Sequence, residues 1–167
     1  MSRLTGASST TTTSELSQFA FLIGDWRCEA TLNAADGEPH ALEARWSGRS
    51  ILDGYAIEDE FRMMGPNGEL MVLGVNLRGY DAEQKKWNMK WLNGLAGTWT
   101  DLGPEELGGV TFEGGSISYA FKQPMAVDTY IRATYANISE AHFTLRAEMS
   151  DDAHTWGQYM VLEAYRV

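Results

Sequence analysis

The sequence has one cysteine, few basic side chains and no long apolar run, and each shortage excludes a class of function. Cys28 is the only cysteine in the 167 residues, so the chain can form no internal disulfide and has no Cys-x-x-Cys metal or redox motif. A lone cysteine among apolar residues normally behaves as a small hydrophobe. We therefore expect Cys28 in the core rather than as a reactive thiol.

Basic residues are scarce. There are 13 Lys and Arg against 23 Asp and Glu, which gives a formal net charge of −10 at pH 7. This charge repels phosphate groups, and no cluster of Lys or Arg provides a local exception. Neither nucleic acid nor an anionic membrane surface is expected as a partner.

Apolar runs such as residues 19–23 and 71–75 are far shorter than the roughly 20 residues that span a bilayer. Residues 1–14 are polar, rich in Ser and Thr, and lack the regions of a secretory signal. We expect residues 1–14 to be a disordered leader of a cytoplasmic protein. Residues 15–167 are expected to form one domain, since 44% apolar residues provide one substantial core.

Motifs of common enzyme and metal sites are also missing. The sequence has no G-x-S-x-G, H-E-x-x-H or Walker motif. His40, His142 and His154 are scattered over turns and strand starts and do not assemble into a metal site. We therefore predict no metal and no cofactor.

A short helix and a series of strands are what the sequence does contain. Ser14 precedes an amphipathic segment over residues 15–22, which predicts an N-cap and about two helical turns ending at Gly24. Beyond Gly24, runs rich in aromatic and β-branched residues recur every eight to twelve residues, separated by turn-forming clusters such as residues 65–68.

Apolar and polar residues alternate within these runs, which predicts one buried apolar face, here called the dry face, for each strand. Its members are predicted to be Trp26, Cys28, Ala30, Leu32, Leu42, Ala44, Trp46, Tyr55, Ile57, Phe61, Met63, Trp87, Met89, Trp91, Phe143, Leu145, Ala147 and Met149. A sheet with one apolar face can close on itself or form a two-sheet sandwich. We predict an all-β fold, a closed antiparallel up-and-down β-barrel of about ten strands with a short N-terminal helix.

The start of the first strand favours the barrel over the sandwich. Residues 21–26, Phe-Leu-Ile-Gly-Asp-Trp, resemble the Gly-x-Trp that opens the first strand of lipocalin-like proteins. Further matching segments are residues 47–49 and 52–54, residues 79–81 before Trp87, and residues 151–156 before a last strand that ends in Arg166. Together they resemble a bacterial family of lipocalin-like, calycin-type barrels of unknown function, over roughly residues 15–167.

This resemblance implies a fold and a lumen but no shared activity. It also implies a structural closure in which Arg166 packs on the indole of Trp26 at one barrel end, a cation–π contact worth roughly 0.5–2 kcal/mol. Some related calycin barrels bind haem through a histidine near the C-terminus. The setting of His154 in a predicted hairpin turn argues against that role here.

A ten-stranded barrel is wide enough to leave a cavity. The predicted lumen residues are Trp46, Tyr55, Asp59, Phe61, Met63, Met89, Trp91, Tyr119, Phe121 and Phe143. Such a lining of rings and methionines suits a hydrophobic or amphipathic small molecule.

Three charged residues raise separate questions. Asp59 shares the apolar face, where a carboxylate either fixes a ligand or pairs with an arginine or a tyrosine hydroxyl. Glu163 raises the same question more weakly. Arg132 is expected to point into solvent, although an inward position would let it bind a ligand carboxylate.

Three functions remain open from the sequence. The first is a non-catalytic protein that binds an apolar or amphipathic small molecule. The second is an isomerase or hydrolase that uses a lumenal carboxylate such as Asp59 as its proton carrier. The third is a homodimeric interaction module, because residues 70–75 place apolar groups on both strand faces. The alternative is that the N-terminal helix covers that outer face within one chain.

Overall fold

The computed structural model describes residues 14–33, 37–123 and 128–167. The leader predicted over residues 1–14 therefore lies outside the described part except for Ser14. The strands are β1 (Gly24–Asn33), β2 (Pro39–Ile51), β3 (Ala56–Met64), β4 (Leu70–Asp81), β5 (Lys86–Asn93), β6 (Thr98–Leu102), β7 (Val110–Glu113), β8 (Ser116–Lys122), β9 (Tyr130–Ala136), β10 (His142–Ser150) and β11 (Gly157–Arg166). Three short 3-10 helices accompany them, η1 (Leu16–Leu22), η2 (Leu52–Gly54) and η3 (Glu105–Leu107).

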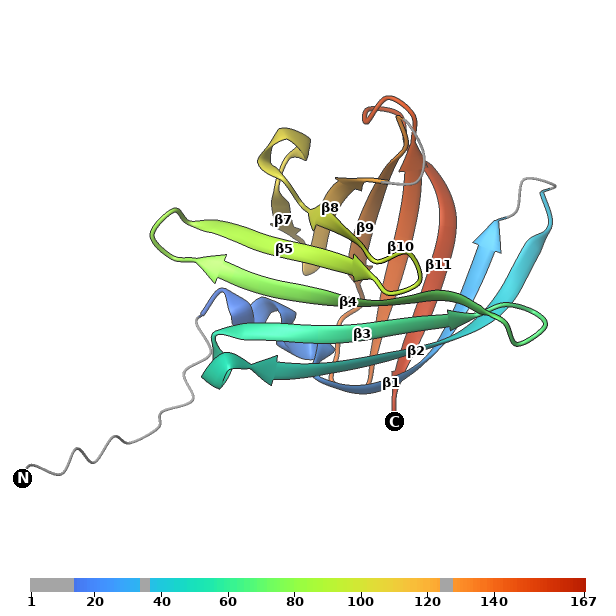
Figure 1. The fold of residues 1–167 in the computed structure, drawn as a ribbon, viewed down its shortest axis with the longest axis horizontal. Coiled ribbons are helices and arrows are strands. Elements are labelled where there is room, and N and C mark those ends of the chain that lie inside the picture. Colours follow the sequence, from blue (N-terminus) through green and yellow to red (C-terminus); the bar gives the residue numbers. More distant parts are fainter. Residues whose placement is uncertain (1–13, 34–36, 124–127) are drawn as a thin grey trace, which may run out of the picture.

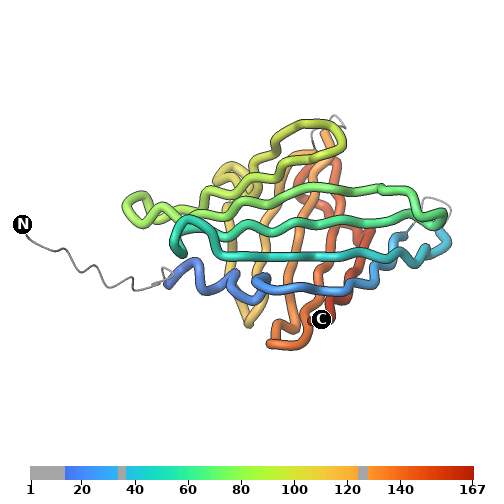
Figure 2. Tube along the Cα trace, turned by 60° about the horizontal axis from the view of Figure 1, so that its bottom comes forward, coloured from blue at the N-terminus to red at the C-terminus, as the bar shows by residue number. Residues whose placement is uncertain are grey.

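All eleven strands belong to one antiparallel sheet, which curls into a half-barrel (Figure 1). The strand order is β6-β5-β4-β3-β2-β1-β11-β10-β9-β8-β7, so the first strand pairs with the last. Figure 2 shows β1 to β5 crossing in front of β8 to β11 at a steep angle. The two halves of the sheet therefore enclose a space between their concave faces.

The predicted closed barrel of ten strands is wrong in two respects. The sheet has eleven strands, and its edges β6 and β7 are not joined by a ladder in the described part of the chain. Near the seam, Gly103 directly after β6 donates its N–H to the carbonyl of Ala120 on β8 at 2.9 Å. β6 and β7 are the two shortest strands of the sheet, with five and four residues, and each is paired along one side only.

Most of the predicted dry face is confirmed. The inward positions of β1, β2 and β10 are buried, among them Trp26, Ala44 and Leu145. Met149 is an exception with 42% of its surface exposed, because a register shift after Ala147 reverses the alternation. Tyr55 is also misplaced. It is 68% exposed since it caps η2 and the regular strand begins only at Ala56.

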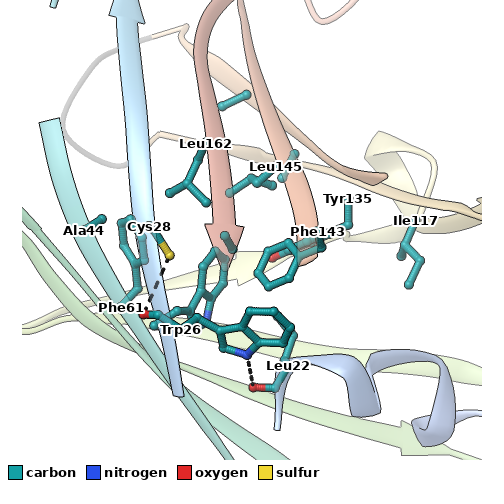
Figure 3. Packing of buried hydrophobic residues seen from close by; sticks show 14 of the residues in the cluster. Leu22, Trp26, Cys28, Ala44, Phe61, Ile117, Tyr135, Phe143, Leu145 and Leu162 are labelled. Atoms are coloured by element: carbon teal, nitrogen blue, oxygen red, sulfur yellow. Dashed lines mark hydrogen bonds between the residues drawn. The ribbon is translucent and has the colours of Figure 1, made fainter. Parts of the chain in front are cut away.

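The predicted N-terminal helix is present as η1, a 3-10 helix with Glu15 rather than Ser14 at its N-cap. Its apolar residues Leu16, Phe19 and Leu22 are at most 1% exposed. Figure 1 shows η1 beside β2, β3 and β4, and the close-up in Figure 3 shows Leu22 beneath the Trp26 indole. The helix therefore closes one end of the half-barrel with its apolar residues in the core, and the alternative in which it covers the outer face is not realised.

None of the helices in the described residues is long and apolar enough to cross a membrane.

Candidate functional site

A cavity of about 420 Å³ lies between the two halves of the sheet. Its wall is mainly apolar and aromatic and consists of Leu32, Trp46, Phe61, Met63, Met71, Val72, Asn76, Trp91, Asn93, Thr100, Leu102, Tyr119, Phe121, Gln123, Ile131, Ala133, Tyr135, Leu145, Ala147, Tyr159 and Met160. The volume falls within the roughly 300–1,000 Å³ of small-molecule sites. This cavity is the candidate binding site.

The structure brings most of the predicted lumen residues together. Six of them belong to the cavity wall: Trp46, Phe61, Met63, Trp91, Tyr119 and Phe121. Met89, Phe143 and Asp59 are buried but do not belong to the wall. The prediction that Tyr55 lines the interior is wrong, as its exposure shows.

Asp59 on β3 lies behind the cavity wall and is completely buried. Its Oδ1 accepts hydrogen bonds from Trp46 Nε1 and Asn76 Nδ2, both at 2.7 Å. Arg78 donates to both carboxylate oxygens, from Nε at 2.7 Å and from Nη2 at 3.2 Å. Four donors are about as many as a carboxylate accepts. Three of these donors bind Oδ1 and one binds Oδ2, and complete burial behind the wall keeps the carboxylate out of reach of a molecule in the cavity.

Arg78 on β4 is equally buried, and each of its five N–H groups has an acceptor. Besides Asp59, these acceptors are Tyr119 Oη at 3.4 Å, Tyr135 Oη at 3.2 Å and Met89 Sδ at 3.7 Å. Burial lowers the pKa of Arg78, but the Asp59 carboxylate together with Tyr135 and Tyr119 more than offsets this effect, and the pKa is held well above its usual value. Arg78 is therefore a permanent buried cation.

Tyr119 on β8 and Tyr135 on β9 complete this buried network at the cavity wall. Their hydroxyl oxygens lie 3.0 Å apart, within hydrogen-bond distance. Burial, followed by the neighbouring Tyr119, raises the pKa of Tyr135 well above its ordinary value. The Tyr135 hydroxyl therefore stays protonated and can act as a donor.

The predicted contact between Trp26 and Arg166 is present. The two residues face each other in the β1–β11 ladder, and the guanidinium carbon lies 4.2 Å from the centroid of the indole. Arg166 also donates to the carbonyls of Glu140 at 2.5 Å and Ile23 at 2.9 Å. It thereby fixes the chain segment that leaves η1.

The other charged candidates lie outside the cavity. Glu163 accepts hydrogen bonds from Thr144 at 3.0 Å and lies 2.6 Å from His142 Nε2, with 37% of its side chain exposed. Arg132 pairs with Glu148 at 2.8 Å, so its inward alternative is not realised. His154 lies in the turn after β10 and is exposed. No group of three or more potential metal ligands occurs within residues 14–33, 37–123 and 128–167.

Sequence reasoning missed Asn76, Arg78 and Tyr135. Two signals were present for the β4 residues. Asn76 and Arg78 continue the alternation that begins at Val72, and Asp59 needed a positively charged partner on the same face. The apolar residues on both faces of β4 obscured this pattern.

The family model described as "Protein of unknown function (DUF1579)" matches residues 11–166. The chain belongs to this family. No curated protein matches this DUF1579 chain in sequence.

Solved structures with the same fold include two that cover almost the whole chain. One is Rv2717c from M. tuberculosis, with a TM-score of 0.64 and 8% identity over 94% of this chain and 99% of that chain. The other is the S-type phycobiliprotein lyase CPES from Guillardia theta, with a TM-score of 0.59 and 8% identity over 93% of each chain. At this identity the likeness concerns the fold alone.

Proposed function

We propose that this protein binds an apolar or amphipathic small molecule in the cavity between the two halves of its sheet. The observation that carries the proposal is the cavity itself, about 420 Å³ with a wall composed largely of rings and aliphatic side chains. Burial of a ligand's apolar surface against such a wall provides the binding free energy. A phycobiliprotein lyase with a similar fold supports the choice of binding over a purely structural role.

The catalytic alternative with Asp59 as proton carrier has less support. The carboxylate accepts four hydrogen bonds and lies behind Trp46 and Asn76, which belong to the cavity wall. A general base must reach the proton that it removes. We therefore assign Asp59 to positioning the wall residues and Arg78, and not to catalysis.

A fluorescence titration with the neutral dye N-phenylnaphthylamine tests the proposal. The dye emits weakly in water and strongly in apolar surroundings. Ala133 and Ala147 belong to the wall, so a phenylalanine at either position fills part of the cavity. We expect saturable binding to the natural protein, and at least about tenfold weaker binding to Ala133→Phe and Ala147→Phe, equivalent to about 1.4 kcal/mol.

Trp99 provides the matched control. It is 53% exposed on the outer face of β6, lies opposite Leu92 and does not belong to the cavity wall. Trp99→Ala is expected to leave dye binding unchanged. Overpacking can destabilise a core, so each variant is first checked by thermal unfolding. Dye binding that survives in folded cavity-filled variants but is lost in Trp99→Ala would contradict the proposal.

A further inference from the structure

The Tyr119–Tyr135 pair has one hydrogen-bond donor left over. Each hydroxyl accepts a hydrogen bond from Arg78, and only one of the two hydroxyl protons is used between the two oxygens. The other proton has no acceptor among the residues that the structure describes. Because both tyrosines belong to the cavity wall and contact a buried cation, this O–H is a strong donor available to a bound molecule.

A second unused hydroxyl lies in the same wall. Thr100 on β6 is 7% exposed, and its Oγ1 has no hydrogen-bond partner in the described part of the chain. β6 adjoins β8 at the seam of the half-barrel, where the Gly103 N–H donates to the Ala120 carbonyl next to Tyr119. Rotation of Thr100 about χ1 turns its hydroxyl without any movement of the backbone. The Thr100 Oγ1 atom is itself buried, so this rotation is what would present the hydroxyl to the cavity as a second donor.

The wall carries no ionic side chain among its described residues, since Asp, Glu, Lys, Arg and His are all missing from it. The charge of Arg78 is already neutralised by Asp59. An ionic group buried in the cavity would have no counter-charge and would lose its hydration. The wall therefore favours an uncharged polar group inside the cavity.

Flat surfaces form much of the remaining wall. Gly74 lets the Trp91 ring lie directly against β4, since a Cβ at position 74 would fall 2.3 Å from that ring. The Trp46 and Phe61 rings also belong to the wall, with centroids 4.9 Å apart and planes tilted by 59° to each other. Planar unsaturated molecules stack well on such surfaces.

Building on the function proposed above, we propose that the ligand is an uncharged, planar, unsaturated molecule that carries a carbonyl group. Its carbonyl oxygen accepts hydrogen bonds from the Tyr119–Tyr135 pair and from Thr100, while its ring system lies against Trp46, Phe61 and Trp91. The buried Asp59–Arg78 pair does not touch the ligand. It polarises the tyrosine hydroxyls and fixes their positions.

Two related dyes separate this inference from the proposed function. Prodan is an uncharged naphthalene with a dimethylamino group and a propionyl ketone, and dimethylaminonaphthalene lacks the ketone. We expect the natural protein to bind prodan more tightly than dimethylaminonaphthalene. The Thr100→Val and Tyr119→Phe substitutions should each weaken prodan binding by about three- to tenfold and leave dimethylaminonaphthalene binding within about twofold.

Thr98 offers a matched control. Its hydroxyl is buried and unpartnered like that of Thr100, but Thr98 is not part of the cavity wall. Thr98→Val should change the affinity for neither dye. Thr100→Val removes an unpaired buried hydroxyl and is expected to melt at the same temperature or higher.

The possible failures are distinguishable. If neither dye binds the natural protein, the proposed function fails. If both dyes bind with equal affinity, or if Thr100→Val weakens both dyes equally, the cavity binds ligands but the carbonyl assignment is wrong.

Discussion

The Arg78 guanidinium lies 4.7 Å from the centroid of the Phe19 ring, so the N-terminal helix covers the buried ion pair of β3 and β4. Phe19 and Arg78 are both fully buried. The helix η1, the Asp59–Arg78 ion pair and the cavity wall are therefore parts of one contact network. A change in one of them is expected to affect the others.

Breaking the Asp59–Arg78 pair should be costly. Arg78→Met or Asp59→Leu leaves an unpaired buried charge, and each is expected to lower the free energy of unfolding by about 3–5 kcal/mol. The double variant should lose less free energy of unfolding than the sum of the two single losses. Urea unfolding of the two single variants and the double variant measures these losses. The exposed Arg62–Glu60 pair is the control, and Arg62→Met should cost at most about 1 kcal/mol. Additive losses would contradict the pairing.

Gly24 should resist substitution because of Arg166. Its φ is +121°, and a Cβ there would lie 2.1 Å from Arg166 Nη1. Gly24→Ala is expected to lower the free energy of unfolding by about 1–3 kcal/mol through backbone strain and displacement of Arg166 from Trp26. Gly157→Ala is the control, since no atom lies within 4 Å of a Cβ at that position. Equal stability of the two variants would show that the Arg166 contact contributes little.

Cys28 should be inert in the folded protein. Burial raises the pKa of its thiol to about 12, so almost no thiolate is present near neutral pH. A thiol reagent such as dithionitrobenzoate at about pH 8 should react with the folded chain only as fast as it unfolds, and at once in denaturant. Rapid reaction of the folded protein would place Cys28 at an accessible surface.

Glu148 should contribute stability that depends on pH. The hydrogen bond from Arg132 lowers the pKa of Glu148 below its ordinary value of 4.5. Because the folded-state pKa is lowered, the stabilisation is fully present above about pH 4.5 and is lost as the pH falls through the folded-state value. Glu148→Gln is expected to lower the free energy of unfolding by at most about 1 kcal/mol at neutral pH, and by nearly nothing at about pH 2. A pH-independent loss would point to packing instead.

Local patterns predicted much of the fold. Alternation identified the inward residues of β1, β2 and β10, and the resemblance to lipocalin-like proteins predicted the Trp26–Arg166 contact. Whether the sheet closes into a barrel could not be predicted, because closure requires the two short edge strands β6 and β7 to pair with each other. Met149 was misassigned since a bulge leaves no clear mark in the sequence. Only part of the candidate site could be predicted from the sequence. The rings of the wall follow from alternation, whereas the partners of Asp59 depend on how β4, β8 and β9 meet in space.

The most direct test of the binding cavity is a set of intermolecular nuclear Overhauser effects between bound N-phenylnaphthylamine and the protein's methyl groups. The methyl groups of Ala133, Ala147 and Val72 belong to the cavity wall, whereas Val75 and Leu92 face each other in the β4–β5 ladder outside it. Effects from the dye to Ala133, Ala147 and Val72 are the predicted result. Effects confined to Val75 and Leu92 would contradict a binding site between the two halves of the sheet.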